Sequence, residues 1–379
     1  MNPFALRSRT LACFGQVLLA AAAFAIRVPA ADPPPTIPAS ESKPATALIL
    51  VEHFESAVKS TNAQGIEWIL PLVDPGIPWS ELVVSWNTEP ATRLEISARS
   101  VSETHTSEWF ILGRWSADPS RGPRTSVNGQ DTPDARVATD TLILRRRSPR
   151  AQVRLVFPTG GDAAGLRLVV YSFSDPTRNP PPNPPDRRAW GRELAVPIRS
   201  QADYPEGVQN WCSPTSLSMV LAHWAKRLAR PELDVNVPTT AAAVLDPGWP
   251  GTGNWPFNTA FAGSLPGLRA CVARLDDLRE VEGWIAAGSP VVASVSGSLL
   301  RGLGEIRAGE GHLVVIRGFS ADSDVMINDP GVAPARGQRT IPRALFLRAW
   351  AASHRTVYFV WPATGAGARP AELNLSRSF

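Results

Sequence analysis

Apolar and polar positions alternate through most of residues 46–174. The alternation is clear at 94–99 and again at 153–157, and turn-forming clusters such as Asp74-Pro75-Gly76 separate such runs. Successive side chains of a strand point to opposite faces, so a period of two predicts strands that bury one face. Several short strands between turns predict an all-β sandwich over 46–174.

Helical periodicity appears in the second part of the chain. Apolar residues at 217–228 recur every three or four positions, which predicts a helix with Ser213 as its cap and Pro214 at its first position. A second helix is predicted at 278–287. The apolar runs that predict strands are 291–295, 313–316, 325–327 and 357–361. Helices followed by a sheet of hairpins predict the α+β class.

Proline-rich stretches divide the 379 residues. Residues 32–45 have no periodicity, which is typical of a flexible leader. Six prolines fall among the eleven residues at 175–185, so we expect a stiff, extended linker over 175–189. The predicted order is therefore the sandwich at 46–174, a second domain at 190–365 and a tail at 366–379.

The N-terminus has the pattern of a secretory signal peptide. Arg7 and Arg9 precede an uncharged, mostly apolar run at 11–26, and small residues follow at 28–30. This pattern predicts a signal peptide over 1–31, cleavage after it, and a secreted or periplasmic protein without a membrane segment. The alternative is an uncleaved anchor, but sixteen residues are short for a hydrocarbon layer of ~30 Å.

Charge and composition exclude several classes of protein. Lys and Arg number 38 against 34 Asp and Glu, and three of the arginines lie in the predicted signal peptide. A nearly neutral mature chain is not typical of a nucleic-acid binder. The sequence has no cluster with metal-ligand spacing and no glycine-rich phosphate loop, so we expect no metal and no cofactor.

Candidate chemistry gathers at Cys212, immediately before the predicted helix. Unpaired N–H groups and the positive end of a helix dipole stabilise a thiolate, which is the reactive form of cysteine. A nucleophile needs a base. His223 is eleven residues along the same helix, about 16 Å away, and His354 lies in a polar loop. His312 opens the strand at 313–316 and is the better candidate.

An orienting acceptor and an oxyanion donor are also needed. Residues 312–319 and 324–329 form a plausible hairpin that lays 312 opposite roughly 331, so Asp329 returns near His312. The register is not fixed by the sequence, and Asp329-Pro330-Gly331 can equally be a simple turn. Gln201 and Gln209 both precede Cys212, and Gln201 is far enough away for its loop to fold back.

These residues together resemble the active-site region of the C39-like cysteine peptidases, a papain-like group. The pattern of that family is a Gln, then Cys-Gly/Ser-Pro-Thr-Ser at a helix start, then Gly-His before a strand, and then Asp-Pro. The chain has Gln201, the sequence Cys-Ser-Pro-Thr-Ser from Cys212, Gly311-His312 and Asp329-Pro330 in that order. The resemblance covers about 190–362.

The resemblance implies a papain-like domain that cleaves amide bonds in a peptide or protein. Carried over by position, it implies Cys212 as nucleophile, His312 as general base, Asp329 as orienter and Gln201 as oxyanion donor. Trp211, Asn254 and Trp255 are candidate substrate-binding residues. For the Gly/Pro-rich segment around Asn254, a packed surface loop is the alternative.

Two other functions remain open on the sequence. The same acyl-thioester could pass to an amine, which would make the protein an acyl or peptidyl transferase. Alternatively, the protein is a binding or adhesion protein whose papain-like domain has lost its catalytic activity. In that case Cys212 could pair with Cys271 in a disulfide. The sandwich itself could bind a cell-envelope ligand.

Overall fold

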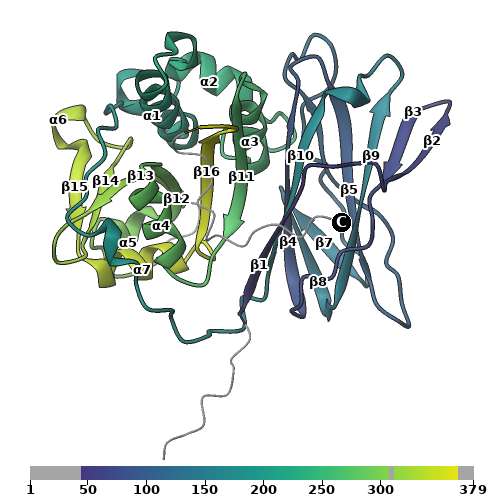
Figure 1. The fold of residues 1–379 in the computed structure, drawn as a ribbon, viewed down its shortest axis with the longest axis horizontal. Helices are drawn as coiled ribbons and strands as arrows, with labels where there is room; N and C mark the ends of the chain where they lie inside the picture. The colour runs from purple at the N-terminus through teal and green to yellow at the C-terminus, as the bar shows by residue number, and fades with distance from the viewer. Residues whose placement is uncertain (1–43, 307–310, 366–379) are drawn as a thin grey trace, which may run out of the picture. The chain divides into compact units, whose positions relative to one another are not determined.

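The structure is a computed structural model that describes residues 44–306 and 311–365 (Figure 1). The predicted signal peptide at 1–31 and tail at 366–379 lie outside the described residues, as does the predicted leader up to residue 43. The described residues belong to one compact unit. Sheets dominate and helices are fewer, which confirms the predicted α+β character.

Two five-stranded antiparallel sheets build the N-terminal half, residues 46–174. Their strand orders are β1-β10-β4-β8-β7 and β2-β3-β9-β5-β6. Each alternating run of the sequence lies in one of these strands. The strands are β1 (Thr46–Val51), β2 (Val58–Asn62), β3 (Gly65–Ile69), β4 (Trp79–Thr88), β5 (Arg93–Val101), β6 (Phe110–Ser116), β7 (Ala135–Ala138), β8 (Thr141–Ser148), β9 (Arg150–Pro158) and β10 (Leu166–Ser174).

Side chains from both sheets share one core. Trp86 of β4, Trp115 of β6 and Leu155 of β9 are at most 1% exposed within it. Packing, rather than ligand binding, therefore accounts for these tryptophans. Trp109 is half-buried, with the guanidinium groups of Arg99 and Arg154 over its ring at 4.3 and 5.0 Å.

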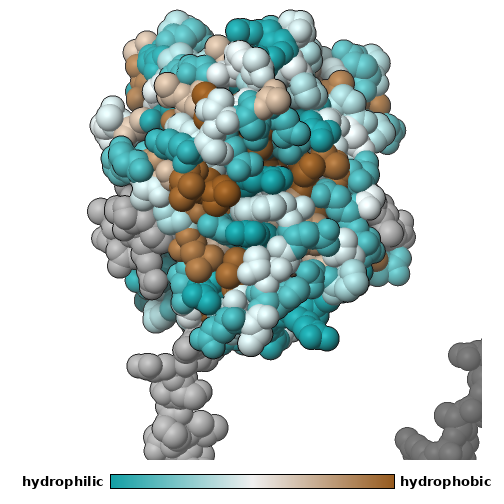
Figure 2. Space-filling model, turned by 90° about the vertical axis from the view of Figure 1, so that its right-hand side faces the viewer, coloured by the Kyte–Doolittle hydropathy of each residue, from teal (hydrophilic) through white to brown (hydrophobic). Residues whose placement is uncertain are grey.

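One face of the N-terminal half is shown in Figure 2. Hydrophobic residues form separate groups there, between hydrophilic ones, rather than one continuous patch. Val58 is the most exposed large apolar side chain described, at 69%. Scattered exposed apolar side chains are normal on a soluble surface and need no ligand to explain them.

A six-stranded antiparallel sheet with the order β11-β16-β12-β13-β14-β15 forms the centre of the C-terminal half. Its strands include all four apolar runs that predicted strands. They are β11 (Leu268–Arg274), β12 (Val291–Ser296), β13 (Gly311–Phe319), β14 (Val325–Asn328), β15 (Gln338–Ile341) and β16 (Thr356–Pro362). The helices are α1 (Cys212–Arg227), α2 (Val237–Val244), α3 (Trp255–Ser264), α4 (Arg279–Ala287), α5 (Gly297–Leu300), α6 (Pro334–Gly337) and α7 (Arg343–Ala351).

Helix starts differ from two sequence-based expectations. Helix α1 begins at Cys212 with Trp211 as its N-cap, so Ser213 lies inside the first turn instead of capping it. The Ser213 hydroxyl lies 3.0 Å from the Tyr358 hydroxyl. The oxygen that would accept a backbone N–H in a cap is therefore engaged with Tyr358. Helix α3 occupies part of the segment expected as a loop. Asn254 caps it and Pro256 lies in its first turn, a start signal that the Gly/Pro-rich composition obscured.

The sheet containing β4 and β10 is buried on both faces. Val84 and Trp86 enter the N-terminal core, whereas Val83 and, in β10, Leu168 belong to the core cluster of the C-terminal half. Strand β11, at the edge of the six-stranded sheet, lies beside this second face (Figure 1). The predicted linker contains neither helix nor strand from Asp175 to Pro185, and the two halves are in direct contact.

No helix in the described ranges combines the length and the apolar character needed to cross a membrane.

Candidate active site

Cys212 lies at the N-terminus of a helix that is buried in the C-terminal half. Residues 213–225 of α1 are buried, whereas Cys212 itself stays partly accessible. The Ser216 hydroxyl donates to the Leu313 carbonyl at 3.1 Å, which fastens the first turn of α1 to strand β13. Hydrogen bonding by the backbone N–H groups of Ser213 and Leu313 lowers the pKa of Cys212. The helix start and the strand therefore converge on one thiol.

His312 and Asp329 meet across the hairpin of β13 and β14. The register pairs Val315 with Asn328 and Ile316 with Ile327, which continues to 312 opposite 331, as the sequence predicted. Residue 329 then lies opposite 314, which has the same parity as 312, so both side chains share a face. His312 Nε2 lies 2.8 Å from Asp329 Oδ1.

Asp329 is held by groups besides His312. Its Oδ1 accepts the Gly331 N–H at 2.9 Å, and its Oδ2 accepts from the Arg339 guanidinium at 3.0 Å. The side chain of Asp329 is only 5% exposed, and that of His312 is 14% exposed. The carboxylate is therefore fixed in position, and it can fix the orientation of the imidazole.

The pKa shifts of these three residues favour an ion pair between thiolate and imidazolium. Burial raises the pKa of Cys212, but the hydrogen bond and the charge of His312 outweigh it and hold this pKa below its ordinary value. Burial opposes the charged form of His312 too, yet hydrogen bonds with Asp329 and Cys212 raise its pKa to about 9. Burial also raises the pKa of Asp329, but His312 and Arg339 are among the groups that lower it to about 2. Because Nε2 faces Asp329, the ring leaves Nδ1 for the thiol.

Gln201 lies in the short helix η3 (Gln201–Asp203), which is anchored to the segment after Asp329. Its backbone N–H donates to the Pro330 carbonyl at 2.9 Å. Its Nε2 donates one proton to the Val208 carbonyl at 2.6 Å, and its side chain is buried. Residues 194–198, before this helix, belong to no helix or strand, and the Leu194 N–H donates to the Arg317 carbonyl at 2.7 Å.

A cavity of about 580 Å³ opens at Cys212. Trp255 lines it, together with Trp249, which is 45% exposed. Trp211 is absent from its lining and lies against Tyr204, with ring centroids 6.0 Å apart. The cavity therefore includes one of the three predicted substrate-binding side chains, that of Trp255.

Asn254 requires a correction. Its side chain is 1% exposed and does not line the cavity. Its Oδ1 accepts the Phe257 N–H at 3.1 Å, and its Nδ2 donates to Asp246 at 2.9 Å. The oxygen caps helix α3 and the nitrogen binds the loop residue Asp246, so Asn254 has a structural role beside the cavity.

The N-terminal half also lines this cavity, which the sequence analysis did not anticipate. Glu81 of β4 and the turn from Ala138 to Thr141 contribute to the wall, and Arg274 of β11 lies beside Glu81 as its ion-pair partner. No local pattern indicates this role, because these residues are separated from Cys212 by at least 71 positions (212 minus 141). Their contribution follows only from how the two halves pack.

Of the other histidines, His223 is buried in the interior, whereas His354 lines the same cavity as Cys212. The ring nitrogens of His223 lie 3.3 and 3.2 Å from the carbonyls of Ala195 and Gly288 in the interior. Nδ1 of His354 lies 3.0 Å from Glu81. Neither is described in contact with Cys212, in agreement with the choice of His312 as partner.

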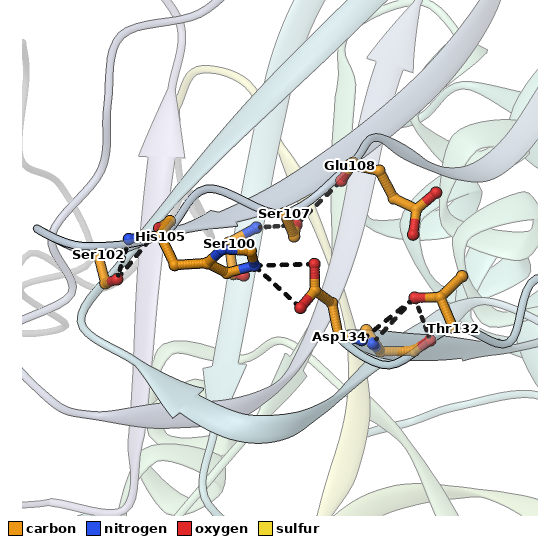
Figure 3. Close-up of polar contacts among 8 residues, drawn as sticks. Ser100, Ser102, His105, Ser107, Glu108, Thr132 and Asp134 are labelled. Atoms are coloured by element: carbon orange, nitrogen blue, oxygen red, sulfur yellow. Dashed lines mark hydrogen bonds and ion pairs between the residues drawn. The ribbon is translucent and has the colours of Figure 1, made fainter.

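A second His–Asp pair joins two loops of the N-terminal half (Figure 3). His105 Nε2 lies 2.9 Å from both carboxylate oxygens of Asp134, and the His105 side chain is 61% exposed. The described cysteines, Cys212 and Cys271, both lie in the C-terminal half. This exposed His–Asp hydrogen bond, in the half without a described cysteine, provides an internal reference for the pair at Cys212.

The disulfide alternative disagrees with the structure. Cys212 and Cys271 are not bridged, and Cys271 is a 1% exposed residue of strand β11. Among residues 44–306 and 311–365, no three His, Cys, Asp or Glu side chains are grouped as metal ligands would be.

Two family models match separate parts of this chain. Residues 193–358 match the model of the Peptidase_C39 like family, and residues 52–170 match that of the Peptidase C39 N-terminal domain. A proposed C39-like peptidase from Bacillus anthracis, solved as a crystal structure, is 17% identical with a TM-score of 0.35, and the match covers 46% of this chain and 99% of that one. No curated protein matches the sequence significantly.

Proposed function

We propose that the protein is a cysteine peptidase that hydrolyses peptide bonds, since residues 193–358 match the model of the Peptidase_C39 like family. The observation that carries this proposal is the arrangement of three side chains from separate elements. Cys212 begins a buried helix and is hydrogen-bonded to His312, whose Nε2 lies 2.8 Å from Asp329. The nucleophile interacts with the base, and the base with the orienter, as covalent catalysis by a thiol requires.

In the proposed reaction, the Cys212 thiolate attacks the carbonyl carbon of the scissile bond. The carbonyl electrons move to oxygen, and the oxyanion accepts from the Cys212 N–H, which as the first N–H of α1 has no acceptor within the helix. The remaining proton of Gln201 Nε2 is the proposed second donor.

The tetrahedral intermediate collapses when the His312 imidazolium gives its proton to the leaving amine. An acyl-thioester on Cys212 remains. His312, now neutral, takes a proton from water, the resulting hydroxide attacks the thioester, and the carboxylic acid leaves as the thiolate returns. Asp329 stays ionised and holds the ring throughout, in agreement with its low pKa.

We also propose the wider setting of this activity. The two sheets at 46–174 share a core, which supports a β-sandwich accessory domain before the papain-like domain. The pattern at 1–31 supports export, so the substrate is a peptide or protein in the periplasm or outside the cell. A cell-envelope ligand for the sandwich stays a prediction.

The test is hydrolysis of a peptide library, measured by mass spectrometry for the wild type and three variants. Cys212→Ala should abolish cleavage, and His312→Ala should lower the rate by ~10²–10⁴-fold. Cys271→Ala is the matched control, because this thiol is buried away from the cavity. Full cleavage by Cys212→Ala would refute the proposal.

Water enriched in oxygen-18 distinguishes hydrolysis from transfer. A peptidase incorporates one labelled oxygen into the new carboxyl group, because water resolves the thioester. A transferase acting on an added amine would yield an unlabelled amide instead. That second product as the dominant one would support the transferase alternative.

A further inference from the structure

The N-terminal half supplies one wall of the cavity in which Cys212 lies. Residues 138–141, at the turn between β7 and β8, line this cavity together with Glu81 of β4. Thr139 has a φ of +58°, a conformation that is uncommon for a β-branched residue and is kept only where the surroundings fix it. The turn therefore has a defined shape where it faces the cavity.

Hydrogen bonds fix this turn to the C-terminal half. Asp140 Oδ2 accepts the Trp255 N–H at 2.9 Å, at the start of helix α3, and Oδ1 accepts from the Thr141 hydroxyl at 3.1 Å. Trp255 itself lines the cavity. The wall from the N-terminal half and the wall from α3 are thus joined directly.

The remaining loop of the cavity is anchored in the same way. Arg124 donates to the Ala242 and Leu245 carbonyls at 2.6 and 3.0 Å, just before the loop at 246–253. The Ser126 N–H donates to Asp246 at 2.9 Å. The loop that carries Trp249 therefore has its position set by the N-terminal half.

The two carboxyl groups that line this cavity have different partners. Glu81 is paired with Arg274 and His354. Asp140 is 6% exposed, and it has no ion pair among the residues that the structure describes. Burial raises the pKa of Asp140 to about 6, against the Trp255 and Thr141 hydrogen bonds and the charge of Arg274, so its carboxyl group is an anion at neutral pH. The phenol of Tyr358, whose pKa is raised by burial, stays neutral nearby.

We propose that the N-terminal half is the specificity wall of this active site, and that Asp140 makes the cavity admit neutral and cationic groups to Cys212 while disfavouring acidic ones. This inference deepens the proposed peptidase activity and rests on it for the nature of the substrate. In a peptide, the selected position is the side chain next to the scissile bond that faces residues 138–141.

A purely structural role of Asp140 predicts a different outcome for one substitution. In Asp140→Asn, the amide oxygen can still accept the Trp255 N–H and the amide nitrogen can donate to the Thr141 hydroxyl. Only the charge is removed. A change in selectivity without a change in thermal midpoint therefore identifies the electrostatic role.

The experiment measures modification of Cys212 by three methanethiosulfonates of similar size: the cationic aminoethyl, the anionic sulfonatoethyl and the neutral methyl reagent. The thiolate attacks the sulfenyl sulfur, a mixed disulfide forms and methanesulfinate leaves. Peptide mapping assigns the label to Cys212. We expect the cation-to-anion rate ratio to fall by about fivefold in Asp140→Asn, as for one charge removed within a partly desolvated cavity. Asp134→Asn, outside the cavity, should leave the ratio unchanged.

A second variant covers the case in which Asp140→Asn does not fold. Thr139→Lys adds a cation to the same wall and should favour the anionic reagent, whereas Thr159→Lys in an exposed turn should not. An unchanged ratio in Thr139→Lys, or in folded Asp140→Asn, would overturn the inference.

Peptide cleavage separates the two proposals. Matched peptides with Lys or Glu beside the scissile bond should be cleaved in a ratio that Asp140→Asn reduces. Cleavage with an unchanged ratio would overturn the specificity wall and leave the peptidase intact. No cleavage of any peptide, together with a shifted reagent ratio, would refute the peptidase and leave the charge of the wall established.

Discussion

Asn87 of β4 forms two hydrogen bonds with the backbone of Ala270 in β11. Its Nδ2 donates to the Ala270 carbonyl at 2.8 Å, and its Oδ1 accepts the Ala270 N–H at 2.9 Å. Ser85 and Ser172 accept the next N–H groups of the same edge, from Val272 at 3.1 Å and Arg274 at 2.9 Å. Side chains of one half thus complete the hydrogen bonding of an edge strand of the other.

This arrangement explains why the two halves form one unit. The unpaired edge of a sheet must be covered or it invites aggregation, and a buried backbone N–H needs a partner. Because the polar side chains that satisfy β11 belong to β4 and β10, the cavity walls contributed by both halves are held in a fixed relation.

Asn87→Leu should therefore destabilise the whole protein. Two buried backbone groups of Ala270 lose their partner, each worth ~1–3 kcal/mol when left unsatisfied, so we expect a loss of about 2–6 kcal/mol in the free energy of unfolding. Urea denaturation at constant slope measures it. Asn62→Ala is the control, at the exposed end of β2 where the Asn62 side chain accepts the Gln64 N–H. Equal midpoints for the two variants would contradict the proposed role of Asn87.

Gly263 in α3 tests the same contact from the opposite side. A Cβ atom at this position would lie 2.2 Å from the Asn87 side chain. Gly263→Ala should therefore lower the unfolding free energy by about 1–3 kcal/mol through overpacking. Gly283→Ala in α4 is the matched control, because its Cβ would meet Asp186 only at 3.9 Å, and the gain in helix propensity should stabilise it by up to ~1 kcal/mol. Thermal midpoints that move in the same direction would contradict this account.

Local pattern predicted much of this fold. The strands at 94–99, 153–157 and 313–316 and the helix at 278–287 each depend on a periodicity that a short window contains. The short turn between β13 and β14 predicted a hairpin that lays 312 opposite roughly 331. Its exact register, and with it the shared face of His312 and Asp329, came only from the structure.

Long-range packing could not be predicted in the same way. Asn87 and Ala270 are 183 positions apart in the sequence. Their contact lies on the second face of the sheet that contains β4 and β10, whereas the alternating sequence pattern suggested that this sheet buries only one face. Leu168 and Val170 of β10 are apolar because they belong to the core cluster of the C-terminal half. The contribution of Asp140 to the cavity is a consequence of that same contact.

Glu81 should make the stability of the protein depend on pH. Its carboxylate is 10% exposed and pairs with Arg274, which is 4% exposed, and with His354. Burial raises the pKa of Glu81, but His354 and Arg274 outweigh it and lower this pKa below its ordinary value of 4.5. A carboxyl group with a depressed pKa contributes stability that is present above its unfolded pKa and is lost as the pH falls through the folded pKa.

Glu81→Gln should therefore cost about 3 kcal/mol near pH 7, since breaking a buried pair leaves Arg274 uncompensated. The difference from the wild type should shrink as the pH falls below 4.5. Urea denaturation across this range measures it, with Glu108→Gln on the surface as the control. A difference that is independent of pH would show that the pair contributes through shape alone.

The ion pair between Cys212 and His312 should be visible in the ultraviolet spectrum. Thiolates absorb near 240 nm, so the wild type minus Cys212→Ala should show a thiolate at pH 7, with a titration midpoint below the ordinary thiol pKa of ~8.5. The pKa of His312 is raised to about 9. A raised pKa means that the stabilisation is complete below the unfolded value of ~6.5 and is lost as the pH rises through about 9.

Asp329→Asn should weaken this ion pair without removing either of its members. The hydrogen bond to Asp329 is the largest contribution that raises the pKa of His312, so in the variant this pKa should fall and the thiolate midpoint should move upward. We expect at least a ~10-fold lower rate of alkylation of Cys212 by iodoacetamide at pH 6, where the wild type still holds the thiolate. Asp134→Asn removes the partner of His105 in the exposed pair and should leave both measurements unchanged. An unaltered thiolate midpoint in Asp329→Asn would show that Asp329 does not orient His312, since a purely structural carboxylate at this position would change stability and not the titration.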